Sequence, residues 1–104
     1  MAEYVEVALA SELPPGRKKL LDIDGRAVAL FNVDGTFYAI DDVCTHDGGP
    51  LAEGELEGCE IACPRHGARF DVRTGAVLCM PAFEPVKAHE VRLENGVVCV
   101  RLRE

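Results

Sequence analysis

Short apolar runs recur along the chain, and turn signals separate them. The runs are rich in Val, Ile, Phe and Tyr, and pairs such as Asp34-Gly35 and Asn95-Gly96 lie between them, which is typical of two-residue β-hairpins. The clearest hairpins are expected over residues 32–40 and 91–100. No stretch of about ten residues has a convincing helical period, although the run SELPPG could begin a single turn. The pattern predicts an all-β domain of about nine short strands, built as a sandwich or a small barrel.

One segment, residues 43–68, interrupts this strand pattern. It holds five glycines and two prolines, which favour loops over regular structure. The length of 104 residues is enough for one domain with one modest core. We therefore expect a single domain over residues 1–104, with a β base formed by about residues 1–42 and 69–104 and a loop-rich insertion over about 43–68.

Charge and cysteine count limit what the chain can do. A net charge of −7 argues against a nucleic-acid partner. Residues 41–64 hold seven acids and no Lys or Arg, so this stretch is either a solvated surface or an acidic docking face for a basic partner. No apolar run approaches the roughly 18 residues that span a bilayer, and the N-terminus lacks the basic start of a signal peptide, so we expect a cytoplasmic protein that does not contact a membrane. Five cysteines, an odd number, then favour metal binding over a disulfide framework.

Four metal-capable side chains form two matched boxes. Cys44 and His46 are one residue apart, sixteen residues follow, and Cys63 and His66 are two residues apart. A zinc finger usually has both cysteines close together and both histidines on a helix, whereas each box here offers one of each and no helix follows. The pattern suits a two-iron cluster with both cysteines on one iron and both histidines on the other. A zinc site or a chance pattern is the alternative.

The runs CTHDGGPL, at 44–51, and CPRHG, at 63–67, resemble the two ligand boxes of the Rieske-type [2Fe-2S] ferredoxins. The hairpin-rich flanks extend this resemblance over about residues 3–103. The resemblance implies an antiparallel β-sandwich or barrel base that carries a loop-rich cluster-binding subdomain.

The same resemblance implies a [2Fe-2S] cluster in which Cys44 and Cys63 bind one iron and the two histidines bind the other, at an exposed tip. The loop Met80-Pro81-Ala82 resembles one that covers the cluster in this family. The residues that would surround the cluster are Thr45, Gly48, Gly49, Pro64, Arg65, Gly67, Ala68, Phe70 and Pro81.

The resemblance also bears on the reduction potential. High-potential members of the family carry an additional cysteine in each box, and Gly49 and Arg65 stand at those positions here. Those members also have a serine and a tyrosine whose hydroxyls donate to sulfur, where this chain has Ala68 and Phe70. Because fewer donors stabilise the reduced cluster less, a potential near the low end of the Rieske range, about −150 mV, is implied.

By resemblance, the chain is a one-electron carrier rather than an enzyme. Its donor would be an NAD(P)H-dependent flavoprotein reductase and its acceptor a non-haem iron oxygenase, and we expect a monomer. A small clustered subunit or accessory factor of a nitrite-reductase-like or iron–sulfur assembly system is the alternative, and a zinc-stabilised binding module is a third interpretation. Cys59, Cys79 and Cys99 are interpreted as small buried hydrophobes and His89 as a surface or satisfied strand residue.

Overall fold

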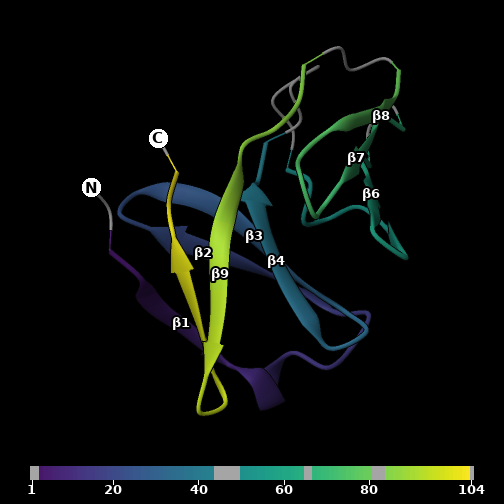
Figure 1. Ribbon diagram of the computed structural model, residues 1–104. Coiled ribbons are helices and arrows are strands. Elements are labelled where there is room, and N and C mark those ends of the chain that lie inside the picture. Colours follow the sequence, from purple (N-terminus) through teal and green to yellow (C-terminus); the bar gives the residue numbers. More distant parts are fainter. Residues whose placement is uncertain (1–2, 44–49, 65–66, 81–83, 104) are drawn as a thin grey trace.

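The computed structural model describes residues 3–43, 50–64, 67–80 and 84–103, and within these ranges ten strands form two antiparallel sheets (Figure 1). The first sheet has the strand order β1-β10-β9-β4-β3-β2, and the second has the order β5-β6-β7-β8. The elements are β1 Val5–Leu9, the 3-10 helix η1 Ala10–Glu12, β2 Lys18–Ile23, β3 Arg26–Val33, β4 Thr36–Asp41, β5 Leu56–Glu57, β6 Glu60–Ala62, β7 Arg69–Asp71, β8 Val77–Cys79, β9 Ala88–Glu94 and β10 Val97–Arg101.

Two hairpin turns have the conformation that their Asx-Gly pairs predicted. Asp34 and Gly35 have φ values of 52° and 92°, and Asn95 and Gly96 have φ values of 49° and 77°. Positive φ at both positions is the type I′ turn, whose twist matches that of two paired strands. The flanking strands pair directly across each turn, so both predicted hairpins, β3–β4 and β9–β10, are confirmed.

The first sheet curls into a nearly closed barrel (Figure 1). Its two edge strands, β1 and β2, therefore come close enough to line the same cleft. Strand β3 is buried on both faces. Val28 and Leu30 belong to the core inside the barrel, whereas Ala29 and Phe31 belong to a second core on its outer face. Side chains alternate across a strand, so the continuous apolar run of β3 reflects this two-sided burial.

The second core joins the barrel to the second sheet. Phe31 and Phe70 have no exposed surface in it, and each contributes about 1.5–3 kcal/mol through burial. Three residues that the sequence placed at the site, Cys63, Ala68 and Phe70, belong to this core. The predicted site is therefore rooted where the two sheets meet. The buried members of the core are Ala29, Phe31, Ile40, Leu51, Ile61, Cys63, Ala68, Phe70, Val72 and Val86.

The all-β fold class is confirmed, and two details differ from the sequence pattern. The second sheet takes in β7 and β8, which the pattern placed with the base, because the turn at Thr74-Gly75 folds β8 back onto β7. The expectation of a buried Cys79 is wrong: its side chain is exposed, because β8 is the edge strand of its sheet. Cys99 is buried as expected, and Cys59 is half-buried. No helix among the described residues is long and apolar enough to cross a membrane.

Candidate metal centre

The second predicted ligand box lies at the tip of the β6–β7 hairpin. The Cys63 amide donates to the Ala68 carbonyl oxygen at 2.6 Å, and the Gly67 amide donates to the Cys63 carbonyl oxygen at 3.0 Å. Gly67 has a φ of 78°, which glycine adopts without the steric cost that other residues incur. Below the turn, Ile61 pairs with Phe70 in the ladder. The hairpin therefore fixes the backbone on both sides of the box.

The Cys63 side chain is well placed to act as a ligand at the edge of the core. It is only 2% exposed and belongs to the same core as Leu51 and Phe70. Its neighbours Pro64 and Gly67 are exposed, so the thiol lies at the boundary between the core and the surface. Thiolate sulfur is a soft ligand that suits iron–sulfur clusters, and a buried position shields such a cluster from water.

The segment with the first ligand box is clamped at both ends. Asp42 is buried, and its Oδ1 accepts a hydrogen bond from the Ala52 amide at 2.6 Å. The Asp42 amide donates to the Ala27 carbonyl oxygen at 3.0 Å, which ties the start of the segment to β3. Leu51 has no exposed surface at the other end. The two flanks of the box are thus fixed, and residues 44–49 themselves lie outside the described part of the chain.

The return of the first segment packs directly on the strand that leads into Cys63. A Cβ added to Gly54 would lie 1.7 Å from the Ala62 carbonyl oxygen, so only glycine permits this approach. The Gly54 amide donates to the Leu51 carbonyl oxygen, and the Ala62 amide donates to the Glu55 carbonyl oxygen, both at 3.0 Å. Backbone contacts between their flanks therefore hold the two boxes together.

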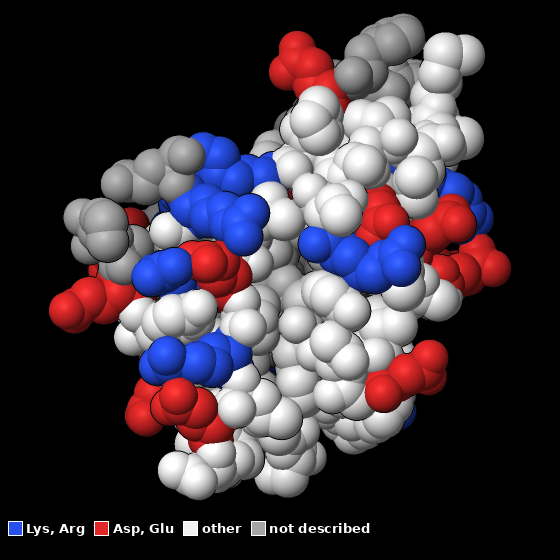
Figure 2. Space-filling model, in the orientation of Figure 1, with Lys and Arg blue, Asp and Glu red and all other residues white. Residues whose placement is uncertain are grey.

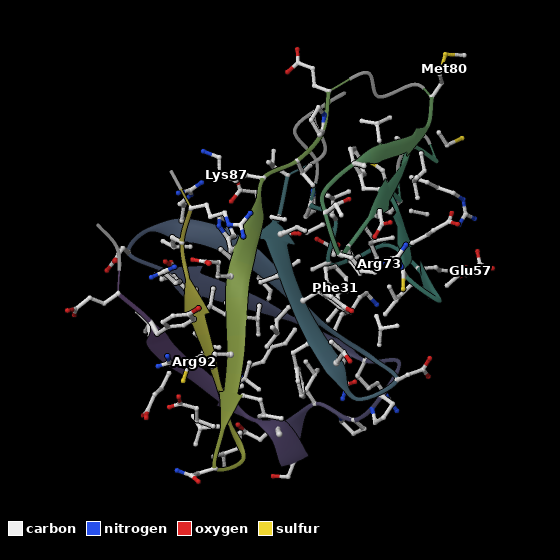
Figure 3. All side chains as sticks on the ribbon, in the orientation of Figure 1. Phe31, Glu57, Arg73, Met80, Lys87 and Arg92 are labelled. Atoms are coloured by element: carbon white, nitrogen blue, oxygen red, sulfur yellow. The ribbon has the colours of Figure 1, made fainter. Side chains whose placement is uncertain are left out.

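A third segment follows β8 and leads into the predicted covering loop. A Cβ added to Gly75 would lie 2.0 Å from the Val86 carbonyl oxygen, and the Val86 amide donates to the Gly75 carbonyl oxygen at 2.9 Å. This contact fixes the return of the segment. Leu78 and Met80 are 48% and 69% exposed, and Met80 lies at the opposite end of the molecule from the β9–β10 turn (Figure 3). Pro81 lies outside the described residues.

Ion pairs between described residues lie on the second sheet and its loops. Arg73 donates two hydrogen bonds to the Asp71 side chain, and this contact lowers the pKa of the carboxyl group. Arg69 donates to Glu57 at 2.9 Å, which raises the pKa of the guanidinium. Figure 2 shows acidic and basic side chains interleaved over β9 and β10, whereas the end that carries Met80 shows white atoms, one acidic side chain and the residues that are not described.

A buried histidine anchors the strand that leads into the first box. His89 Nδ1 accepts a hydrogen bond from the Arg103 amide at 3.0 Å, so the ring proton is on Nε2, which donates to Asp41 Oδ1 at 2.7 Å. Arg26 donates to the other oxygen of Asp41 at 3.3 Å. Burial lowers the pKa of His89. The interpretation of His89 as a satisfied strand residue is confirmed, and the residue serves the base rather than a metal.

The structure describes part of the predicted site. Because three of the four predicted ligands lie outside the described residues, no group of three metal-binding side chains is found among the described ones. The described site residues are Cys63, Pro64, Gly67, Ala68 and Phe70. Those outside the described ranges are Cys44, Thr45, His46, Gly48, Gly49, Arg65, His66 and Pro81.

Comparison with known families decides which cofactor the chain binds. The model of the Rieske [2Fe-2S] domain matches residues 3–90. The chain belongs to this family. The cofactor is therefore a Rieske [2Fe-2S] cluster, and the soft, buried sulfur of Cys63, in the second core, fits one of its iron ligands.

Known Rieske ferredoxins match along nearly the whole chain. The ferredoxin component of the naphthalene 1,2-dioxygenase/salicylate 5-hydroxylase systems of a Ralstonia species is 37% identical over 99 residues, which are 95% of each chain. The ferredoxin of carbazole 1,9a-dioxygenase from Nocardioides aromaticivorans matches with a TM-score of 0.92 and 36% identity over 95% of this chain and 97% of that one. A chain in a complex of reduced oxygenase and oxidised ferredoxin in carbazole 1,9a-dioxygenase matches with a TM-score of 0.91 and 36% identity, over 94% and 92% of the two chains. The chain is a Rieske ferredoxin, an electron carrier rather than a catalyst.

Sequence reasoning missed three residues that shape this ferredoxin's site. Asp42 had a visible signal, because two consecutive aspartates precede the first box and only one can face the barrel side of the strand. Gly54 and Gly75 had no sequence signal, because the backbone atoms they approach belong to Ala62 and Val86, eight and eleven residues away.

Proposed function

We propose that this Rieske ferredoxin carries one electron at a time from an NAD(P)H-dependent flavoprotein reductase to a non-haem iron oxygenase. The observation that carries the proposal is the match to a ferredoxin component of dioxygenase systems, at 37% identity over 95% of each chain. A carbazole 1,9a-dioxygenase ferredoxin that this chain resembles at a TM-score of 0.91 is known in complex with its oxygenase. An oxygenase is therefore the class of acceptor that we assign.

We assign the cluster ligands to Cys44 and Cys63 on one iron and to His46 and His66 on the other. The support is that the flanks of both boxes meet. Cys63 begins the turn of the β6–β7 hairpin, and the return of the first segment packs on the strand before it. Ligands whose flanks are fixed in this way need little rearrangement when an electron arrives or leaves, which favours rapid transfer.

The ligand set and its surroundings also bear on the potential. When bound, the cluster stores one electron, and two neutral imidazoles in place of two thiolates make its reduction easier. Ala68 and Phe70 have no exposed surface and no hydroxyl, so neither offers a side-chain donor to a cluster sulfur. We therefore place the potential of the ferredoxin near the low end of the Rieske range, at about −150 mV.

We also propose that the ferredoxin works as a monomer in the cytoplasm. The four cysteines among the described residues are all free, which fits a reducing compartment. A carrier must leave its donor before it meets its acceptor, and small, transient interfaces suit that exchange. The exposed side chains of Leu78 and Met80 offer such a surface at one end of the molecule.

Electron paramagnetic resonance of the dithionite-reduced protein, with iron and zinc analysis, tests the cofactor and its ligands. We expect about two irons per chain and a rhombic signal whose average g lies below that of a four-cysteine cluster. One zinc per chain and no such signal would contradict the assignment.

His66→Cys should shift the signal toward the four-cysteine type, whereas His89→Gln should leave it unchanged.

Anaerobic mixing of the reduced ferredoxin with an oxidised ring-hydroxylating oxygenase tests the acceptor class. We expect the visible absorption of the oxidised ferredoxin to return as the oxygenase takes the electron. A cluster-loaded protein that transfers no electron to oxygenases of this class, yet reduces a small chemical acceptor, would contradict the assignment of an oxygenase as partner.

A further inference from the structure

Asp41 is the last residue of β4 and Asp42 follows it, and the two carboxylates serve different parts of the molecule. Successive side chains of a strand point to opposite faces. The Asp41 carboxylate faces the base, where it pairs with His89 at 2.7 Å and with Arg26 at 3.3 Å. The Asp42 carboxylate accepts the hydrogen bond from Ala52 at 2.6 Å. One residue thus anchors the strand to the barrel, and the next reaches across to the far end of the first ligand box.

The Asp42–Ala52 bond closes the segment that holds the first box. It joins two residues ten apart in sequence, and the residues between them include the whole Cys-x-His pair. The 2.6 Å distance is that of a strong hydrogen bond to a charged acceptor. Asp42 is only 8% exposed, so water competes little for its carboxylate. Because a closed loop has far fewer conformations than an open one, the bond restricts where the box can lie.

The clamp is connected to the other ligand box. Leu51, next to Ala52, belongs to the same core as Cys63, and Gly54 abuts the carbonyl oxygen of Ala62. Asp42 itself is tied to β3 through its amide. Asp42 therefore links the barrel, through its amide, to the return of the first box, through its carboxylate, and that return packs on the strand that precedes the second box.

We propose that Asp42 is a positioning residue for the cluster: its carboxylate sets the separation of the two ends of the first box, and so the place from which Cys44 and His46 reach the iron. The inference rests on the ligand assignment proposed above. Groups that orient metal ligands typically change metal affinity by about 10–100-fold when they are removed. The clamp should therefore govern how firmly the cluster is retained.

Release of iron to excess EDTA, followed by the loss of visible absorption, tests the clamp. Asp42→Ala should release iron about 10–100-fold faster than the wild type, because the Ala52 amide loses its acceptor. Asp42→Asn keeps a side-chain oxygen that can accept this bond, so release should stay within about threefold of the wild type. Asp22→Ala is the matched control, because the Asp22 carboxylate also accepts a backbone amide, that of Gly25 at 2.9 Å, but in the β2–β3 turn. Its release rate should equal that of the wild type.

Three results would overturn the proposal: wild-type release from Asp42→Ala, equally fast release from Asp22→Ala, or no rescue by Asp42→Asn. Amide hydrogen exchange of the wild type adds a test that needs no variant to fold. The Ala52 amide should be protected, and exchange at the rate of an unstructured peptide would also overturn the clamp. A failure of the cofactor assignment is distinguishable, because wild type that holds zinc refutes the Rieske cluster, while the ratio of metal release between variants still measures the clamp.

Discussion

The imidazole of His89 is held neutral by its burial and by the hydrogen bond at Nδ1, against the Asp41 carboxylate, which favours the charged ring. A proton on Nδ1 would place a donor against the Arg103 amide, which is itself a donor. Burial disfavours the charged ring as well, since its side chain has no exposed surface. The neutral ring, Asp41 and Arg26 together fix the corner where β3, β4, β9 and the C-terminal segment meet. Protonation of this one residue should therefore weaken the base.

We expect His89 to make the ferredoxin less stable as the pH falls below about 6.5, the value for an exposed histidine. Its folded pKa is lowered, so in acid the unfolded chain binds more protons than the folded one. The contribution of neutral His89 to stability is complete above that pH. As the pH falls from the unfolded to the folded pKa value, the free energy of unfolding falls by up to about 1.4 kcal/mol per pH unit. Thermal unfolding of the wild type and His89→Gln at pH 7.5 and 5.5 measures the effect. The variant should lose less stability between the two pH values, and equal losses would refute the assignment.

Ala68 offers a second test at the scale of a residue, on the potential. Ala68→Ser places a hydroxyl beside the backbone that holds Cys63, since the Ala68 carbonyl oxygen accepts the Cys63 amide. A hydrogen bond to sulfur worth about 1 kcal/mol in the reduced state raises a one-electron potential by about 40 mV. Voltammetry of the variant checks this value. Ala76→Ser, in the exposed β7–β8 turn, is the control and should leave the potential unchanged. An unchanged potential in Ala68→Ser would show that its hydroxyl does not reach sulfur.

Elements were predictable where their chemistry is local. The Asp34-Gly35 and Asn95-Gly96 turns carry the information for their hairpins within two residues, and both form as predicted. The sheet that a hairpin joins is not determined by its local sequence. Strands β7 and β8 could have joined either sheet, and the packing of Phe70 and Val72 in the second core places them beside β6. The same limit applies to Cys79, whose exposure depends on which strand lies at the edge of the sheet.

The contact of Gly54 with β6 should be essential to the second sheet. Gly54→Ala would force a Cβ to 1.7 Å from a backbone oxygen, which cannot move without breaking the strand pairing. We expect it to cost about 3 kcal/mol, the upper end of the typical range for overpacking, and to speed the loss of the cluster. Gly35→Ala is the control, because its Cβ would meet open space and only its positive φ costs about 1–2 kcal/mol. Chemical denaturation measures both, and equal costs would show that the close approach does not matter.

At the scale of the whole molecule, the fold separates stability from chemistry. The core inside the barrel, with Val28, Leu30 and Val98, contains none of the predicted site residues, whereas the second core holds Cys63. The ligand boxes could be read from the sequence because each pairs its ligands within a few residues. The contacts that position the boxes could not be predicted from the sequence, since the Asp42–Ala52 hydrogen bond and the approach of Gly54 to β6 exist only once the chain has folded.

The location of the docking surface separates two interpretations of the whole molecule. Met80 is 69% exposed at the end beside the cluster segments, and a buried, uncharged centre is typical of protein interfaces. If partners dock there, Met80→Glu should slow electron transfer to the oxygenase by about tenfold, as expected for an interface residue worth about 1.4 kcal/mol, without changing the resonance signal. Leu93→Glu adds the same charge at a site that is 50% exposed on β9, and it should transfer electrons at the wild-type rate.

The other interpretation places docking on the acidic stretch of residues 41–64. In that case both variants would transfer electrons at nearly the wild-type rate, and added salt would slow transfer in all three proteins because it screens attraction between exposed charges. Rates measured at two salt concentrations for the wild type and both variants therefore distinguish the surfaces. A transfer rate that depends on Met80 and little on salt would assign docking to the end of the molecule that carries Met80.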